Sequence, residues 1–241
     1  MKTTIKLLAL FIFIGFTSCN FNANFGNGID GSGNVITEKR NINQQFTKIS
    51  ASTGVNVILE QGSPAEVEVE TDDNLIDYVI TEVENGTLII KIEGNINMMT
   101  TVNIRVKTET ISSLESSSGS SISSKNSLSG SSIALKSSSG SEIEVDLEYE
   151  TVSCESTSGS DIKASGKALH LETKSSSGSE IDAKNLAANE VYAQSTSGSS
   201  TTVKPIVKLD AKASSGSSID YVQEPKNISK EETSGGSVDK E

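Results

Sequence analysis

The sequence predicts an all-β fold, a right-handed parallel β-helix (solenoid) of Ser/Gly-rich coils, each roughly 20 residues long. Three observations predict it: a repeated glycine signature, an apolar alternation in phase with that signature, and a scarcity of large rings. Aromatic residues make up 4% of the 241-residue chain and Trp is absent. A core without large rings must be filled by Ile, Val, Leu, Ala and Thr, which favours stacked strands over a bulky globular interior.

The repeated signature is Ser/Thr-Ser-Gly-Ser, which recurs from residue 116 onward. Successive glycines of the signature are separated by 21, 19, 19, 20, 18 and 19 residues. Such a sustained period is typical of a solenoid, in which each repeat forms one coil. These glycines are Gly119, Gly140, Gly159, Gly178, Gly198, Gly216 and Gly235.

Apolar residues stand at fixed distances from each glycine, which distinguishes a solenoid from a disordered Ser/Gly linker of the same composition. Strands place every second residue on one face, so these columns should point inward when coils stack. Ser137, Ser156, Ser175 and Ser195 share the inward phase, and we expect their hydroxyls to bond to one another or to the corner backbone. The apolar columns are Ile133, Val152, Leu171, Val191 and Leu209; Leu135, Cys154, Thr173, Ala193 and Ala211; and Ile122, Ile143, Ile162, Ile181, Thr201 and Ile219.

The outward phase is polar. Each repeat is expected to form two or three short strands, with the glycine relieving backbone strain at a corner. The preference for right-handed crossovers predicts the hand of the helix. One outward column would present a ladder of hydroxyls, from Ser138, Thr157, Ser176, Thr196 and Ser214.

Residues 34–110 follow a looser version of this scheme and are expected to form the first coils or a cap, ahead of the repetitive coils of residues 111–241. Asn85-Gly86 lies between two apolar strands and is a tight hairpin signal, which indicates either antiparallel pairs in this part or a role as the cap. Residues 72–80 are compatible with a single helical turn.

Residues 1–18 have the charged start, the short apolar run and the small final residues of a signal peptide. The apolar run is too short for a spanning helix, which needs roughly 20 residues. Phe16-Thr17-Ser18-Cys19 resembles the bacterial lipobox, in which the cysteine becomes the first mature residue and is acylated. Residues 19–33 are rich in Asn and Gly and are expected to form a flexible tether.

These features predict a cell-envelope protein that contacts the membrane through acyl chains on Cys19, with the outer membrane as the expected site and its periplasmic or surface face left open. Loss of Lys2 and Lys6 with the signal peptide takes the formal charge from −12 to −14. Such an acidic chain repels nucleic acid, which is therefore excluded as a partner.

The sequence offers no catalytic centre and no cofactor motif. Its one histidine, His170, stands on the outward phase without a clustered acid. No serine has the His and Asp neighbours that activate a nucleophile. Cys154 falls in an apolar column and is expected to be buried and inert. With Cys19 acylated, no intrachain disulfide can form.

One acidic column is a candidate metal site. Stacked carboxylates of Glu142, Asp161 and Glu180 would suit Ca²⁺, although Ser121 and Ser200 interrupt the column and a solvated face is the preferred interpretation. Two residues further along, Glu144, Lys163 and Asp182 alternate in sign, which indicates cross-strand charge pairing.

Four segments together resemble the head GIN domain family, which is described as an autotransporter-adhesin head. They are Phe46-Thr47-Lys48-Ile49, Gly54-Val55-Asn56-Val57-Ile58-Leu59, Gly86-Thr87-Leu88-Ile89-Ile90 and Ser234-Gly235-Gly236-Ser237-Val238. The resemblance covers roughly residues 30–241 and implies a β-helical fold. It implies no catalytic residue, because its motifs are signatures of fold.

The leading hypothesis is therefore a non-enzymatic envelope lipoprotein that presents a rigid, adhesin-like surface to a glycan, a cell-wall component or an envelope protein. A second hypothesis is a structural protein that assembles end to end through uncapped terminal coils. A glycan-cleaving β-helix enzyme is the third. The sequence leaves the oligomeric state open.

Overall fold

The computed structural model describes residues 28–97 and 101–241, so the predicted signal peptide, Cys19 and the first part of the tether lie outside the described residues. The described chain is all-β apart from one 3-10 turn, η1 (Ile76–Tyr78). No described helix is long and apolar enough to cross a membrane. The strands are β1 (Val35–Arg40), β2 (Lys48–Ala51), β3 (Asn56–Gln61), β4 (Glu66–Asp72), β5 (Val79–Glu84), β6 (Thr87–Ile92), β7 (Asn103–Thr108), β8 (Ser113–Ser116), β9 (Ser121–Ser124), β10 (Leu128–Ser138), β11 (Glu142–Thr157), β12 (Asp161–Ser176), β13 (Glu180–Ser195), β14 (Ser200–Ser214), β15 (Ser218–Tyr221), β16 (Asn227–Thr233) and β17 (Ser237–Lys240).

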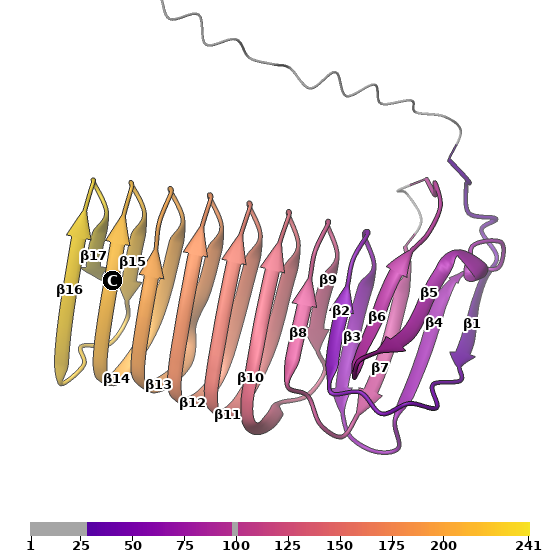
Figure 1. The fold of residues 1–241 in the computed structure, drawn as a ribbon, viewed down its shortest axis with the longest axis horizontal. Coiled ribbons are helices and arrows are strands. Elements are labelled where there is room, and N and C mark those ends of the chain that lie inside the picture. The colour runs from indigo at the N-terminus through magenta and orange to yellow at the C-terminus, as the bar shows by residue number, and fades with distance from the viewer. Residues whose placement is uncertain (1–27, 98–100) are drawn as a thin grey trace, which may run out of the picture.

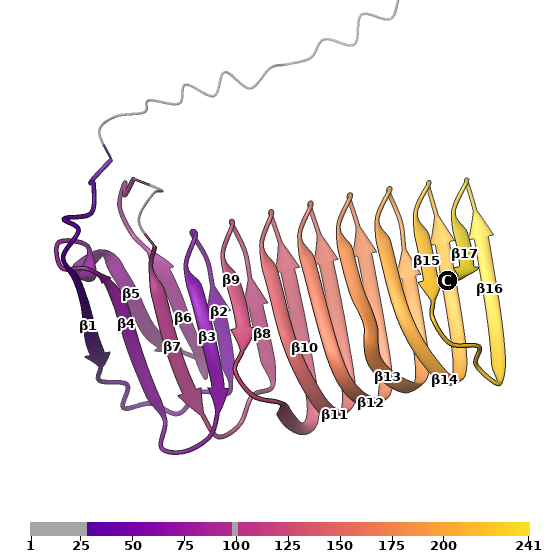
Figure 2. The same ribbon diagram turned by 180° about the vertical axis from the view of Figure 1, so that it is seen from behind.

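The strands wrap into a parallel β-solenoid with two sides (Figure 1), seen from behind in Figure 2. On the pre-tip side, strands run toward a tight Ser-Gly turn, the tip, at the upper edge in Figure 1; on the post-tip side they run away from it. Long strands pass around the opposite bend. In β11, residues 142–149 lie on the post-tip side of one coil and residues 151–157 on the pre-tip side of the next. The predicted stacking of Ser/Gly-rich coils is confirmed.

The tips form a hydrogen-bonded ladder along the edge of the solenoid. Ser139 and Gly140 both adopt the left-handed backbone region, with φ of 56° and 68°, which reverses the chain within two residues. The Gly140 N–H donates to the Ser158 carbonyl of the next coil (3.2 Å), and Gly159 donates to Ser177 in the same way (3.2 Å). Because neighbouring tips bond, the repeated glycines are corner residues, as predicted.

The three apolar columns predicted from the repeat point inward and are buried. Ile143 and Ile162, for example, are both fully buried and are paired in register. The Tyr149 ring packs on Gly130, where an added Cβ would lie 2.7 Å from the ring. The Tyr149 hydroxyl donates to the Ile111 carbonyl (2.9 Å). The core is thus a set of stacked small and branched side chains, as the scarcity of rings indicates.

The predicted inward serines are buried, and two of them donate to the corner backbone as expected, Ser137 to the Ser141 carbonyl (3.0 Å) and Ser156 to the Ser160 carbonyl (2.8 Å). Ser137 and Ser156 contact the hydroxyls of Ser141 and Ser160, each four residues on at the same tip (2.9 Å for both pairs). Only Ser175 donates to its stacked neighbour, Ser195 (2.8 Å). The expectation of bonds among these serines or to the corner backbone is therefore met mainly within each corner.

A second buried serine column closes each tip. Ser141 accepts from the Ser138 N–H (3.0 Å) and lies within hydrogen-bonding distance of the Ser116 carbonyl of the neighbouring coil (2.7 Å). The Ser141 hydroxyl takes the place of a backbone partner that the chain reversal removes. The Ser138 N–H and the Ser116 carbonyl are therefore both paired at the tip. The column consists of Ser120, Ser141, Ser160, Ser179, Ser199 and Ser217.

The first half of the chain departs from the chain order of coils. β2 lies between β6 and β8 on the pre-tip side, with Lys48 paired to both Thr87 and Ser113. On the post-tip side β3 lies between β7 and β9 in the same way. The coil formed by β2 and β3 is therefore inserted between the coil of β6 and β7, which follows it in sequence, and the coil of β8 and β9, which begins the repetitive part. In Figure 1 the indigo β2 and β3 accordingly lie between strands of the later, magenta to pink colours.

Antiparallel strands complete this end, as predicted. The β5–β6 hairpin turns at Asn85-Gly86, both with positive φ (50° and 76°), and β4 is antiparallel to both β1 and β7. Residues 76–78 form the predicted helical turn as η1. Residues 28–33, the final part of the predicted tether, contact this end: the Ile29 N–H donates to the Asn95 carbonyl (2.8 Å), and Asn74 donates to the Asp30 carbonyl (2.9 Å). Backbone groups and Asn side chains provide these bonds.

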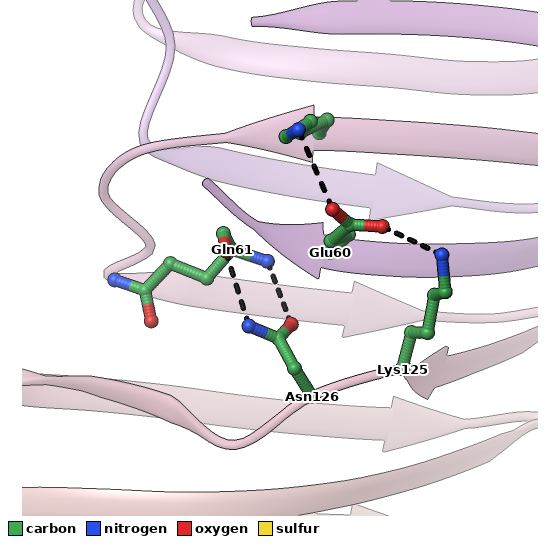
Figure 3. Close-up of polar contacts among 5 residues, drawn as sticks. Glu60, Gln61, Lys125 and Asn126 are labelled. Carbon is green, nitrogen blue, oxygen red and sulfur yellow. Dashed lines mark hydrogen bonds and ion pairs between the residues drawn. The ribbon is translucent and has the colours of Figure 1, made fainter. Parts of the chain in front are cut away.

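Side-chain amides join the inserted coil to the repetitive part (Figure 3). The Gln61 N–H donates to Asn126 Oδ1 (2.9 Å) and Asn126 Nδ2 donates to the Gln61 carbonyl (3.1 Å), so one amide imitates a neighbouring strand. The Gln61 side-chain amide forms the same kind of bond pair with the Ser129 backbone. It accepts from the Ser129 N–H (2.6 Å) and donates to the Ser129 carbonyl (3.0 Å). These bonds continue the ladder where the chain leaves the regular coil.

Candidate binding groove

Stacking brings the predicted acidic column together in the expected register. Glu142 pairs with Asp161, and Asp161 pairs with Glu180 on the next coil. Lys163, two residues further along, forms an ion pair with Glu142 (2.7 Å), and this hydrogen bond and charge raise the pKa of Lys163. Lys163 thus pairs diagonally with Glu142, and Asp182 pairs with Lys184 of its own strand (2.8 Å), in place of the expected pairing among Glu144, Lys163 and Asp182. Across residues 28–97 and 101–241, no three His, Cys, Asp or Glu side chains converge to hold a metal ion.

A β-bulge beside this column hollows the post-tip side. Lys163 is paired with Asp182, but Ser165 is paired with Asn185, so β13 has one residue more than β12 across this step. An extra residue in one strand bends it locally and breaks the flat surface of a sheet. Next to the bulge, Gly166 has a φ of 106°, and a Cβ there would lie 2.0 Å from the Leu147 carbonyl oxygen, so only glycine fits.

The resulting groove has a volume of about 530 Å³ and is built by four successive coils. Hydrogen bonds fix parts of its wall: Ser165 donates to Asp146 Oδ1 (2.9 Å), and the Asp146 N–H donates to the Ser124 hydroxyl (3.0 Å). Carboxylates outnumber the single ammonium group of Lys163. The lining residues are Ser123, Ser124, Glu144, Val145, Asp146, Lys163, Ala164, Ser165, Asp182 and Asn185.

This lining is rich in groups that form hydrogen bonds. Hydroxyl, amide and carboxylate oxygens accept hydrogen bonds, and the Ser, Asn and Lys groups donate them. The excess of carboxylates repels anionic ligands. The groove therefore suits a neutral ligand with many hydroxyls.

His170 lies elsewhere, on the outer pre-tip side, and its side chain is 57% exposed. The sequence suggested no acidic neighbour for it, yet stacking places Glu190 in register beside it, with 3.5 Å between His170 Nδ1 and Glu190 Oε2. A partner one coil away is 20 positions distant in sequence and is missed when only nearby residues are considered. The pair shares a shallow hollow of about 240 Å³ with Lys208 and Asp210.

Cys154 is buried in its predicted column, and burial raises the pKa of its thiol to about 12. The phase of the repeat is therefore correct at this position.

The outward hydroxyl column is half-buried, and only parts of it are bonded: Ser176 donates to Thr157 (3.1 Å) and Ser214 donates to Thr196 (3.2 Å). Cys19, the predicted acylation site, lies outside the described residues.

The groove itself was not predicted, although the sequence contains a trace of its cause. The interval between Gly178 and Gly198 is 20 residues, one more than the 19 of the two preceding coils. That additional residue is the bulge in β13. Irregular repeat length thus marks the position of the groove, but it does not reveal which side chains line it.

A two-sided solenoid with polar outer faces and serine-lined tips defines a class of rod-like β-solenoid proteins. The chain belongs to the head GIN domain family: residues 45–225 match the family model described as "Putative auto-transporter adhesin, head GIN domain". The resemblance predicted from sequence is confirmed. A comparison with curated proteins finds no match.

Solved structures share the fold. A "putative adhesin" from Bacteroides fragilis is similar with a TM-score of 0.83 at 22% identity, covering 89% of this chain and 100% of that chain. A "putative lipid binding protein" from Parabacteroides distasonis gives 0.73 at 21% identity, with coverage of 89% and 100%. A "putative adhesin" from Parabacteroides merdae gives 0.72 at 18% identity, with coverage of 89% and 99%. The family is one of adhesin-like proteins, which indicates a location at the cell envelope or surface.

Proposed function

We propose that this protein is a non-enzymatic cell-envelope lipoprotein whose solenoid presents an adhesin-like surface, and that the groove on the post-tip side binds a neutral, hydroxyl-rich glycan chain. The observation that carries the proposal is the groove lining, in which hydrogen-bonding side chains from four successive coils face one hollow. Coils repeat along the rod axis, so contacts repeat along a chain lying parallel to it. Membership of the head GIN domain family supports the adhesin-like role.

The test uses the full chain with Cys19→Ala, which removes the predicted acylation site, applied to a glycan array and to isolated envelope glycans. We expect retention on neutral glycans that weakens when Lys163→Gln removes the ammonium group from the groove. Lys136→Gln is the matched control, because Lys136 lies on the other side of the solenoid, is similarly exposed (56% against 53%) and also pairs with a glutamate. Equal retention of both variants would reject the groove as the binding site.

The enzyme alternative is separated in the same experiment. Hydrolysis of a glycosidic bond uses a pair of carboxyl groups, and Glu144, Asp146 and Asp182 are the candidates in this groove. For a surface that binds without cleaving, we expect neutral glycans incubated with the protein to show no new reducing or unsaturated ends. Released ends that disappear with Asp146→Asn would replace binding by cleavage as the function.

The lipid anchor is tested separately. In the native host, wild-type protein should partition into the detergent phase with the membrane fraction, whereas the Cys19→Ala variant should be released, because the acyl chains would provide the membrane contact. Continued detergent-dependent partitioning of Cys19→Ala would reject the lipoprotein assignment.

A further inference from the structure

The last coil, formed by β16 and β17, differs from every coil before it at its inward positions. In β14 these positions are occupied by the small residues Ala211 and Ala213, both buried. Their partners in β16 are Lys230 and Glu232. Two charged side chains therefore occupy the inward phase, where the repeat elsewhere places small or apolar residues.

Both charged side chains contact the backbone of β17. Lys230 Nζ donates to the Val238 carbonyl (2.7 Å), and the Val238 N–H donates to Glu232 Oε1 (2.7 Å). Lys230 Nζ also lies 4.8 Å from the centre of the Tyr221 ring, a cation–π distance. Each charged group is thus held in place by a second strand.

The geometry of β17 shows what these contacts cover. Among the described strands β17 is paired with β15 alone. The N–H groups of Ser237 and Glu241 donate toward that coil, to Ser217 (3.0 Å) and Tyr221 (3.2 Å). Successive residues of a strand direct their backbone groups to opposite sides, so Val238 directs its N–H and carbonyl away from the solenoid. Those are the groups to which a further coil or a foreign strand would bond.

We propose that Lys230 and Glu232 form an end cap that occupies the outward backbone groups of Val238 and prevents the last coil from pairing with the last coil of a second copy of this chain. Inward-pointing charges on an edge are one way in which β-proteins block strand addition. This inference is independent of the ligand of the groove. The hypothesis of end-to-end assembly through uncapped terminal coils makes the opposite assumption about this end.

The partner that the cap excludes is specific. The opposite end of the solenoid terminates in the antiparallel strands β1 and β5, so it does not offer the parallel coil that β16 and β17 present. An uncovered last coil can match only another last coil, and such a contact is self-complementary and closes as a dimer.

The test is the double variant K230A/E232A in the full chain carrying Cys19→Ala, measured by size-exclusion chromatography with light scattering over a wide concentration range. We expect the parent chain to remain monomeric and the double variant to approach twice the monomer mass and stop there. A double variant that stays monomeric like its parent would overturn the proposal, as would a parent chain that dimerises through this end. Growth beyond the dimer would overturn the assignment of the partner surface.

A charge-matched control separates the cap from a general loss of solubility. Lys212 of β14 and Glu231 of β16 form an ion pair (3.0 Å) between the last coil and the coil before it, so K212A/E231A also removes one positive and one negative charge. This control should remain monomeric. The single variant Glu232→Gln keeps an acceptor for the Val238 N–H and should dimerise more weakly than Glu232→Ala. Circular dichroism verifies that each variant is folded, and equal dimerisation of the control would overturn the proposal.

Discussion

The regular coils from Leu128 to Tyr221 and the strands that precede them are stabilised in different ways. In the regular coils, equivalent positions of successive repeats make the same contacts. Ile143 is paired with Ile162, and each tip glycine donates its N–H to the serine carbonyl of the next tip. In the first part this stacking continues, as where Val57 is paired with Ile104 and Ile122, but bonds between unlike groups are added across long sequence separations, as where Gln61 and Asn126 bond 65 positions apart. Repetition makes the first kind of contact visible as a period in sequence. The second kind depends on single residues, so it leaves no periodic trace.

The largest effect is expected where the two regions join. Leu114 in β8 is fully buried between Ile49 of β2 and Leu135 of β10. Leu114→Ala should lower the free energy of unfolding by about 2–5 kcal/mol, because it leaves a cavity in a packed core. Leu169→Ala, at a position that is 47% exposed, is the control and should change little. Urea unfolding followed by circular dichroism measures both, and equal stabilities would show that the joint is not packed as described.

The serine corners of the regular coils give the next largest effect. Ser175 is buried and bonded to the hydroxyls of Ser195 and Ser199, whereas Ser176 is half-exposed. Ser175→Val should destabilise the fold by about 1–3 kcal/mol, because it leaves those hydroxyls short of a partner. Ser176→Val should cost less. Equal melting temperatures for the two variants would contradict the inward assignment of Ser175.

In the first region the corresponding test concerns an amide. Asn126→Ala should cost about 1–2 kcal/mol, because it removes both partners of the Gln61 backbone. Its neighbour Lys125 is 68% exposed and forms an ion pair with Glu60, so Lys125→Ala should cost at most about 1 kcal/mol. Thermal unfolding of both variants compares them. A larger loss for Lys125→Ala would show that charge, and not the amide, joins the inserted coil.

One substitution in the regular coils should increase stability. Thr173 lies in the buried column of Leu135 and Cys154, and its hydroxyl has no hydrogen-bond partner among the described residues. Thr173→Val keeps the shape and removes the unpaired group, so we expect a gain of about 1 kcal/mol in the free energy of unfolding. Thr173→Val and Ser175→Val, only two residues apart in β12, should therefore change the free energy of unfolding in opposite directions. A destabilised Thr173→Val would mean that this hydroxyl is paired in solution.

The smallest expected effect concerns pH. Burial, together with the charges of Asp239 and Glu241, raises the pKa of Asp220. A carboxyl group with a raised pKa in the folded state favours folding at low pH, and that contribution is lost as the pH rises through the folded pKa. Asp220→Asn should therefore raise the melting temperature slightly at neutral pH, and the difference should vanish in acid. A difference that grows in acid would contradict the raised pKa.

The sequence by itself determined the stacked coils, the inward columns and the corner positions, because a solenoid places the same position of every repeat in the same environment. Cys154 and Ser156 could be assigned to the interior from their phase alone, and the Asn85-Gly86 hairpin from its turn residues. Only the tertiary structure decided the rest. The insertion of β2 and β3 between β6–β7 and β8–β9 depends on pairing across 39 to 65 positions, which no local pattern encodes. The groove depends on how one extra residue in β13 displaces the strand, and the end cap on two side chains that reach across a coil. Periodicity specifies what repeats, whereas these features arise where the repeat is broken.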